Sequence, residues 1–169
     1  EIYGTPSSGT PTKLAVTSLN GDSSPSTETA FDVVVQTQDA SNTPTNVSSD
    51  VNVTLTKATG TGTLGGTLTG TISSGSNSVT ISGVTFDTNG SGISITASDD
   101  ASSLTSGTSS TFNVLTAADQ LVLVSVPTTG YTNTALSDFT VEARRSNDSS
   151  VDANYTKSIT INKATGSGN

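Results

Sequence analysis

The chain has 169 residues, a formal net charge of −8 at pH 7, and hydrophobic side chains at 30% of its positions. The negative charge disfavours nucleic acid and anionic lipid surfaces as partners, because both repel an acidic protein. The absence of cysteine excludes disulfides and thiolate metal sites, and no apolar run is long enough to insert into a membrane.

The first part of the chain predicts a linker and then three short strands. Residues 1–12 are expected to form a linker or the end of a preceding unit, because they hold two prolines and little apolar content. Strands are predicted near 13–19, over 31–38 and over 51–56, where apolar residues alternate with polar ones. The turn residues Asn20, Gly21 and Asp22 separate the first two strands.

The glycine-rich stretch 57–72 is expected to carry the chain from one sheet to another, and to end in a strand near 68–72. Further strands follow at 79–86, 93–97 and 112–114. The sequence Asp87-Thr88-Asn89-Gly90 predicts a hairpin between two of them. The side chains of all four phenylalanines are expected to point into the core: Phe31, Phe86, Phe112 and Phe139.

About seven short strands with no helical period predict an all-β fold, a two-sheet antiparallel sandwich of the immunoglobulin-like kind. The complete unit is expected to span residues 13–115, followed by a short linker at 116–120. Residues 121–169 then match only the first half of such a unit.

This division depends on an internal repeat of about 107 residues. Lys57-Ala58-Thr59-Gly60 returns as Lys163-Ala164-Thr165-Gly166, Leu14-x-Val16 matches Leu121-x-Leu123, and the strand at Phe31 matches the one at Phe139. The sequence therefore predicts tandem sandwich repeats with the second one truncated. Either the natural chain continues beyond the second copy, or a neighbouring chain supplies its missing strands.

The strand Phe31–Val35, the glycine run 58–67 and the segment 83–97 resemble bacterial immunoglobulin-like repeats, of the Big type found in large cell-surface adhesins. The Thr/Asn/Gly-rich style is similar to that of gliding-motility adhesins of Bacteroidetes. The resemblance implies secretion, a location on the bacterial cell surface, a role in cell adhesion and no catalytic residues.

A calcium site is the strongest candidate for a functional site. Asp87, Asn89 and Ser91 have the alternate oxygen spacing that begins a calcium loop, although the twelfth position is Ser98 and not Glu. An ordinary hairpin turn explains the same residues. The domain junction offers a second arrangement, in which Asp119 would meet loop carboxylates such as Asp22 or Asp50. No other cofactor is expected.

We expect a non-enzymatic protein, because without His or Cys a nucleophile would need Lys or a carboxylate as its base. The predicted function is that of a structural spacer in the stalk of an extracellular adhesin, with neighbouring repeats of the same chain as its main partners. One alternative is an adhesive module that binds a surface glycan or protein through its loops. Another is a filament or surface-layer subunit completed by strand donation.

Overall fold

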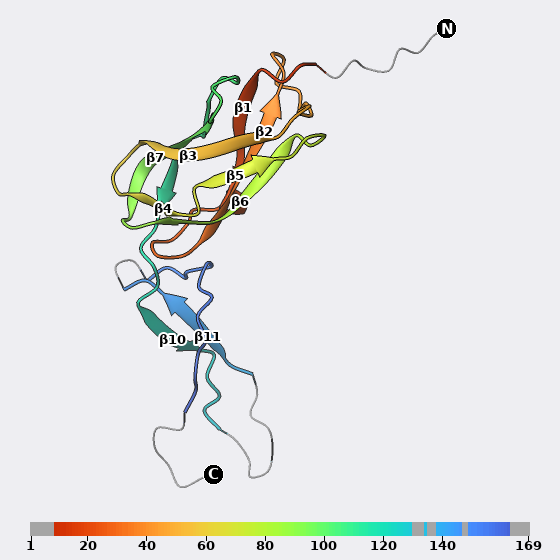
Figure 1. Cartoon of the computed structure of the whole chain (residues 1–169). Coiled ribbons are helices and arrows are strands. Elements are labelled where there is room, and N and C mark those ends of the chain that lie inside the picture. Colours follow the sequence, from red (N-terminus) through yellow and green to blue (C-terminus); the bar gives the residue numbers. More distant parts are fainter. Residues whose placement is uncertain (1–8, 130–133, 135–137, 147–148, 163–169) are drawn as a thin grey trace. The chain divides into compact units, whose positions relative to one another are not determined.

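A computed structural model describes residues 9–129, 134, 138–146 and 149–162 (Figure 1). The chain divides into two compact units, Glu1–Ala117 (unit 1) and Ala118–Asn169 (unit 2). This boundary lies inside the stretch 116–120 for which the sequence predicts a linker.

Unit 1 is built almost entirely of strands, with one short 3-10 turn, η1 (Asn20–Asp22). Its strands are β1 (Lys13–Leu19), β2 (Phe31–Gln38), β3 (Val51–Thr59), β4 (Leu64–Gly66), β5 (Thr69–Ile72), β6 (Ser78–Phe86), β7 (Gly90–Asp99), β8 (Gly107–Thr108) and β9 (Phe112–Val114).

These strands form two sheets. The first sheet has the order β1-β2-β6-β4, and the second has the order β5-β3-β7-β8, with β9 also paired to β7. All the named strand pairs are antiparallel. The prediction of an all-β antiparallel sandwich is therefore confirmed.

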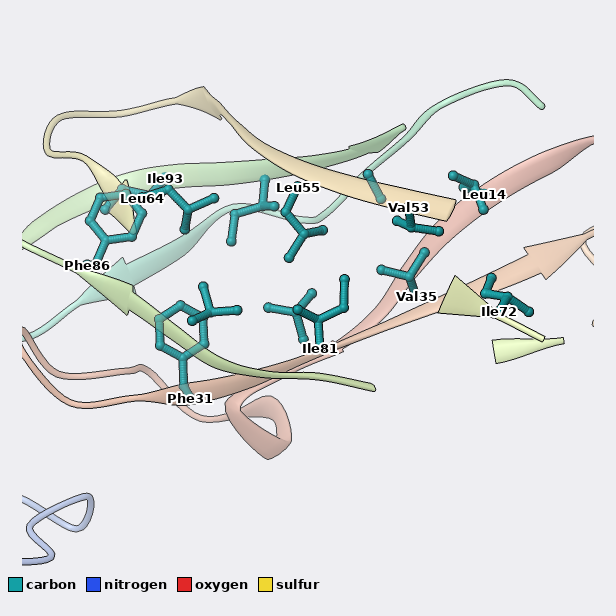
Figure 2. Packing of buried hydrophobic residues seen from close by; sticks show 14 of the residues in the cluster. Leu14, Phe31, Val35, Val53, Leu55, Leu64, Ile72, Ile81, Phe86 and Ile93 are labelled. Carbon is teal, nitrogen blue, oxygen red and sulfur yellow. The ribbon is translucent and has the colours of Figure 1, made fainter. Parts of the chain in front are cut away.

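Alternation along the strands fills the space between the sheets. In β2, Phe31, Val33, Val35 and Thr37 are buried, and the residues between them are exposed or half-buried. Figure 2 shows side chains from both sheets meeting in this space, including Phe31 and Ile81 from the first sheet and Leu55 and Ile93 from the second. Because successive side chains of a strand point to opposite faces, this alternation determines which face of β2 is buried.

The chain changes sheets repeatedly after β3. It enters the first sheet for the short β4 and returns to the second for β5, so the predicted crossing in the stretch 57–72 is confirmed and occurs twice. The predicted hairpin at Asp87–Gly90 is wrong. β6 belongs to the first sheet and β7 to the second, so this turn joins the two sheets and not two paired neighbours.

Two isolated parallel bridges join early and late segments of unit 1. Near the start of β1, the amide of Leu14 donates to the carbonyl of Thr105 at 2.8 Å. Beyond η1, the amide of Thr27 donates to the carbonyl of Leu115, also at 2.8 Å. The first and last segments of unit 1 are thus hydrogen-bonded to each other.

Unit 2 contains one antiparallel strand pair, β10 (Gln120–Val124) and β11 (Thr140–Arg144). A buried ion pair lies beside it, with 2.9 Å between Arg145 Nη2 and a carboxylate oxygen of Asp152. Large apolar side chains of this unit are nonetheless exposed, among them Leu121 at 50% and Leu123 at 55%.

Candidate functional site

The repeated Lys-Ala-Thr-Gly motif forms a loop closed by its own lysine. Lys57 Nζ donates to the carbonyls of Gly60 at 2.9 Å and Gly62 at 2.5 Å. Both glycines have positive φ, +85° and +83°, and a Cβ on Gly60 would lie 2.6 Å from Ile93 Cγ1. Glycine is therefore required at these positions. The second copy of the motif, at 163–168, lies outside the described residues.

Asp87, the first predicted calcium ligand, fastens the end of this loop. Its Oδ1 accepts a hydrogen bond from the Thr63 amide at 2.7 Å. That bond, followed by bonds from the Thr88 and Thr63 hydroxyls, lowers the pKa of the Asp87 carboxyl. The carboxylate thus already has a structural role, because it holds the glycine loop of β3–β4 against the turn that follows β6.

The other two predicted ligands, Asn89 and Ser91, are exposed. A calcium loop wraps about twelve residues around the ion, but here β7 begins at Gly90 and runs extended to Asp99. At about 3.3 Å per residue, Asp99 lies roughly 30 Å from the turn at Asp87, so neither Asp99 nor Asp100 completes the set. In the described part of the chain, no three Asp, Glu, His or Cys side chains gather around one point. Among the described residues, Asp87 is therefore the single carboxylate of the predicted site, and calcium titration tests whether it binds the ion.

Two carboxylates of the second predicted metal site, Asp119 and Asp50, also have local partners, and the third, Asp22, lines the groove described below. Asp119 accepts hydrogen bonds from the hydroxyl and the amide of Ser146, which lower the pKa of its carboxyl. Asp50 accepts from the Ser74 amide at 2.8 Å. Asp119 and Asp50 therefore each stabilise a loop within their own unit.

Asp99 is a buried carboxylate whose structural role sequence reasoning did not predict. It ends β7 at 5% exposure and accepts from the amides of Ala101, Ser103 and Leu104 and from the Ser103 hydroxyl. Burial acts to raise the pKa of this carboxyl, but the hydrogen bonds, led by that of Ser103, outweigh burial and leave the pKa below its ordinary value. An Asp followed by small polar residues at a strand end is the available sequence signal.

A groove of about 390 Å³ lies between β1 and the segment 109–113. Val16, Leu19 and Phe112 line it and also pack on the hydrophobic core. The remaining lining residues are polar: Thr17, Ser18, Asp22, Ser23, Ser24, Ser109, Ser110, Thr111 and Asn113. The groove thus has a small apolar base and a lining made mostly of hydroxyl, amide and carboxylate groups.

The four phenylalanines are buried to different degrees. Phe31 and Phe86 are buried as expected, at 4% and 1% exposure. Phe112 shares one face of β9 with the buried Val114 and packs against the core, but it is only half-buried and also lines the groove. Phe139 is half-buried as well.

Comparisons with known proteins return no match to any family model, curated protein or solved structure. Among the residues that the structure describes, no helix is long and apolar enough to cross a membrane.

Proposed function

We propose that this protein is a structural spacer, a repeated β-sandwich module from the stalk of an extracellular bacterial adhesin, with no enzymatic role. Three features support this function. They are a shared hydrogen-bond pattern in the two units, a junction whose two flanking amides are both hydrogen-bonded, and the resemblance to bacterial immunoglobulin-like repeats.

The strand pair of unit 2 has the register of the first pair of unit 1. In unit 1, Leu14 lies opposite Thr37 and Val16 opposite Val35. In unit 2, Leu121 lies opposite Ala143 and Leu123 opposite Val141. Each β10 residue is thus about 107 positions beyond its β1 counterpart, and each β11 residue about 106 beyond its β2 counterpart.

Hydrogen bonds after the second strand repeat at the same offset. The amide of Thr45 donates to the carbonyl of Thr37 at 3.0 Å, and that of Asp152 donates to the carbonyl of Ala143 at 2.8 Å. Likewise, isolated antiparallel bridges join Gln38 to Pro44 in unit 1 and Arg144 to Val151 in unit 2.

This correspondence refines the sequence match. It places Phe139 at the position of Val33 and not of Phe31, with the offset of the Lys57 motif. Local hydrogen bonding in two separate segments agrees with one alignment, which favours two copies of one repeat over a chance resemblance of short strands.

The junction between the units is the observation that carries the spacer proposal. The amide of Ala117 donates to Thr27 Oγ1 at 3.0 Å, within unit 1. The amide of the next residue, Ala118, donates to Asp152 Oδ2 at 2.9 Å, within unit 2. The last amide of unit 1 and the first amide of unit 2 are thus each hydrogen-bonded within their own unit. A spacer needs such junctions, because slack between units would shorten its reach.

Distance measurements between the units test this proposal. The chain has no cysteine, so spin labels can be attached at D32C in β2 and Q120C in β10, which are both exposed positions. The two labels should give one narrow distance distribution. Inserting Gly-Ser-Gly-Ser between Ala117 and Ala118 should broaden it. A distribution in the unmodified chain as broad as in the insertion variant would contradict a spacer role.

The adhesive alternative is favoured by the groove at Phe112. Its hydroxyls, the Asn113 amide and the Asp22 carboxylate suit a neutral polyhydroxylated ligand, and neither Lys nor Arg lines it. Saturation-transfer NMR with neutral mono- and disaccharides would test this function. Signals that survive in both N113A and D22A would place any binding elsewhere.

A further inference from the structure

Two Asn-Gly pairs lie at turns of unit 1, and the spacer function uses neither of them. Asn20-Gly21 lies in η1, and Asn89-Gly90 stands where the turn after β6 enters β7. Asparagine is a thermolabile residue. Glycine after it exposes the following backbone nitrogen, because glycine has no side chain to shield that atom.

The reaction open to such a pair is deamidation. The backbone nitrogen of the glycine attacks Cγ of the asparagine, a C–N bond forms, and the bond from Cγ to Nδ2 breaks. Nδ2 leaves as ammonia with the proton that the backbone nitrogen loses, so a cyclic imide remains. Water then opens the imide at either carbonyl, which gives aspartate or isoaspartate. The attack is intramolecular and water is the co-reactant, so the rate depends on how freely the side chain reaches the nitrogen.

Hydrogen bonds restrain Asn20. Its Nδ2 donates to the carbonyl of Ser23 at 3.2 Å, and its own carbonyl accepts from the Ser23 amide, also at 3.2 Å. The residue is half-buried. The bond from Nδ2 must break before this nitrogen can leave as ammonia, and the backbone bond keeps the turn closed. Both bonds therefore oppose deamidation of Asn20.

Asn89 is not restrained in this way. It is exposed, and its side chain has no hydrogen-bond partner among the residues that the structure describes. Gly90 is the first residue of β7 and lies at the end of the pairing of β7 with β9. Strand ends open more readily than strand centres. The Asn89 side chain can therefore rotate toward the Gly90 nitrogen without breaking a side-chain hydrogen bond.

We infer that Asn89 is a site of spontaneous deamidation in the folded protein, and that the fold protects Asn20 from the same reaction. The isoaspartate product places an extra methylene in the main chain directly before Gly90. The backbone there is already close to the glycine loop, since a Cβ on Gly90 would lie 2.8 Å from Thr61 Oγ1. The product should therefore loosen the first pair of β7 with β9, in which Gly90 lies opposite Val114.

Mass spectrometry of the intact chain, aged in mildly alkaline buffer and then digested with trypsin, measures both reactions at once. The lysines and arginines place Asn20 on peptide 14–57 and Asn89 on peptide 58–144. Peptide 58–144 should gain about 1 Da, because an NH2 group is replaced by OH, and fragmentation should place the gain at residue 89. Asn20 should react at least about tenfold more slowly, because its hydrogen bonds raise the barrier.

Three controls separate the effect of the fold from that of the local sequence. In concentrated urea the hydrogen bonds of Asn20 are lost, so both asparagines should react at rates within about threefold of each other. N89Q should abolish the gain at residue 89 in the folded chain, because the longer side chain has to close a larger ring. N89D adds the carboxylate without the extra methylene and should unfold at the urea midpoint of the parent protein. The deamidated fraction, separated by its added negative charge, should unfold at a lower midpoint.

Equal rates at the two asparagines in the folded chain would overturn the inference, and so would a faster reaction at Asn20. The same holds if Asn89 stays unmodified in the folded chain while the unfolded chain reacts. A deamidated fraction with the midpoint of N89D would overturn the predicted loosening of β7.

Discussion

Replacing Asp99 by Asn should destabilise unit 1 far more than the same change at Asp100. The Oδ2 of Asp99 accepts three hydrogen bonds, from the amides of Ser103 and Leu104 and from the Ser103 hydroxyl. An Asn at this buried position keeps one acceptor oxygen, for example for the Ala101 amide. Its NH2 group would then face the donors of Ser103 and Leu104, which would lose their acceptor. The exposed Asp100 accepts one side-chain hydrogen bond among the described residues, from the Thr54 hydroxyl.

The expected cost follows from these bonds. Each lost hydrogen bond contributes about 1 kcal/mol net, and somewhat more when the acceptor is charged. D99N should therefore lower the free energy of unfolding by about 3 kcal/mol, whereas D100N should change it by about 0.5 kcal/mol or less. For a domain of this size, 3 kcal/mol corresponds to a fall in Tm of about 10–20 °C. Urea unfolding of the two variants, followed by circular dichroism, measures the difference.

The pH dependence supplies an independent check. The folded-state pKa of Asp99 lies below its ordinary value, so its contribution is fully present above the unfolded pKa of about 3.9 and is lost as the pH falls through the folded pKa. The stability gap between the parent protein and D99N should thus be constant near neutral pH and narrow below about pH 4. Equal stability of D99N and D100N at pH 7, or a gap that widens in acid, would refute the argument.

Three further predictions concern packing, the buried ion pair and metal binding. A Cβ at Gly107 would lie 2.2 Å from the carbonyl oxygen of Leu14, so G107A should unfold unit 1 or lower its free energy of unfolding by at least about 3 kcal/mol. At Gly75 a Cβ would meet open space, but φ is +84°, so G75A should lower the free energy of unfolding by about 1 kcal/mol in the same urea assay. R145M leaves the carboxylate of Asp152 buried without its cation and should destabilise unit 2 by about 3–5 kcal/mol. In NMR spectra the dispersed resonances of unit 2 should disappear while those of unit 1 persist. Intact unit 2 resonances would contradict this prediction. Millimolar calcium should raise Tm by less than about 1 °C, because Asp87 and Asp119 already accept local hydrogen bonds. A larger rise that D87A abolishes would show that calcium binds at Asp87.

Strand positions were predictable where one face is buried. The alternation of Phe31, Val33 and Val35 predicts both the existence of β2 and its inner face, because a half-buried strand must alternate. The same reasoning failed at Asp87–Gly90. An Asn-Gly turn is recognisable locally, but whether its two flanking strands pair or separate into different sheets depends on partners far away in the sequence.

The candidate sites were less predictable than the fold. Asp87 was singled out by its spacing to Asn89, yet its partner is Thr63, which lies far upstream and is brought near only by the pairing of β4 with β6. Asp99 is one acidic residue among many in the sequence, and only the end of β7 shows that it organises a loop. The hydrogen bonds of Lys57 to its own loop were likewise not predictable from the sequence, although the repeat of its motif had drawn attention to the position.

The parallel contacts at the edge of unit 1 have a mechanical consequence. The chain enters near Thr12, whose carbonyl accepts from Thr105, and leaves just after Leu115, whose amide donates to the carbonyl of Pro25. Tension applied to the two ends would load these bonds in shear along the strand direction, so that several must break together before the sandwich opens. A stalk made of such modules would resist drag on a tethered cell by slow rupture of whole units, and not by gradual unzipping.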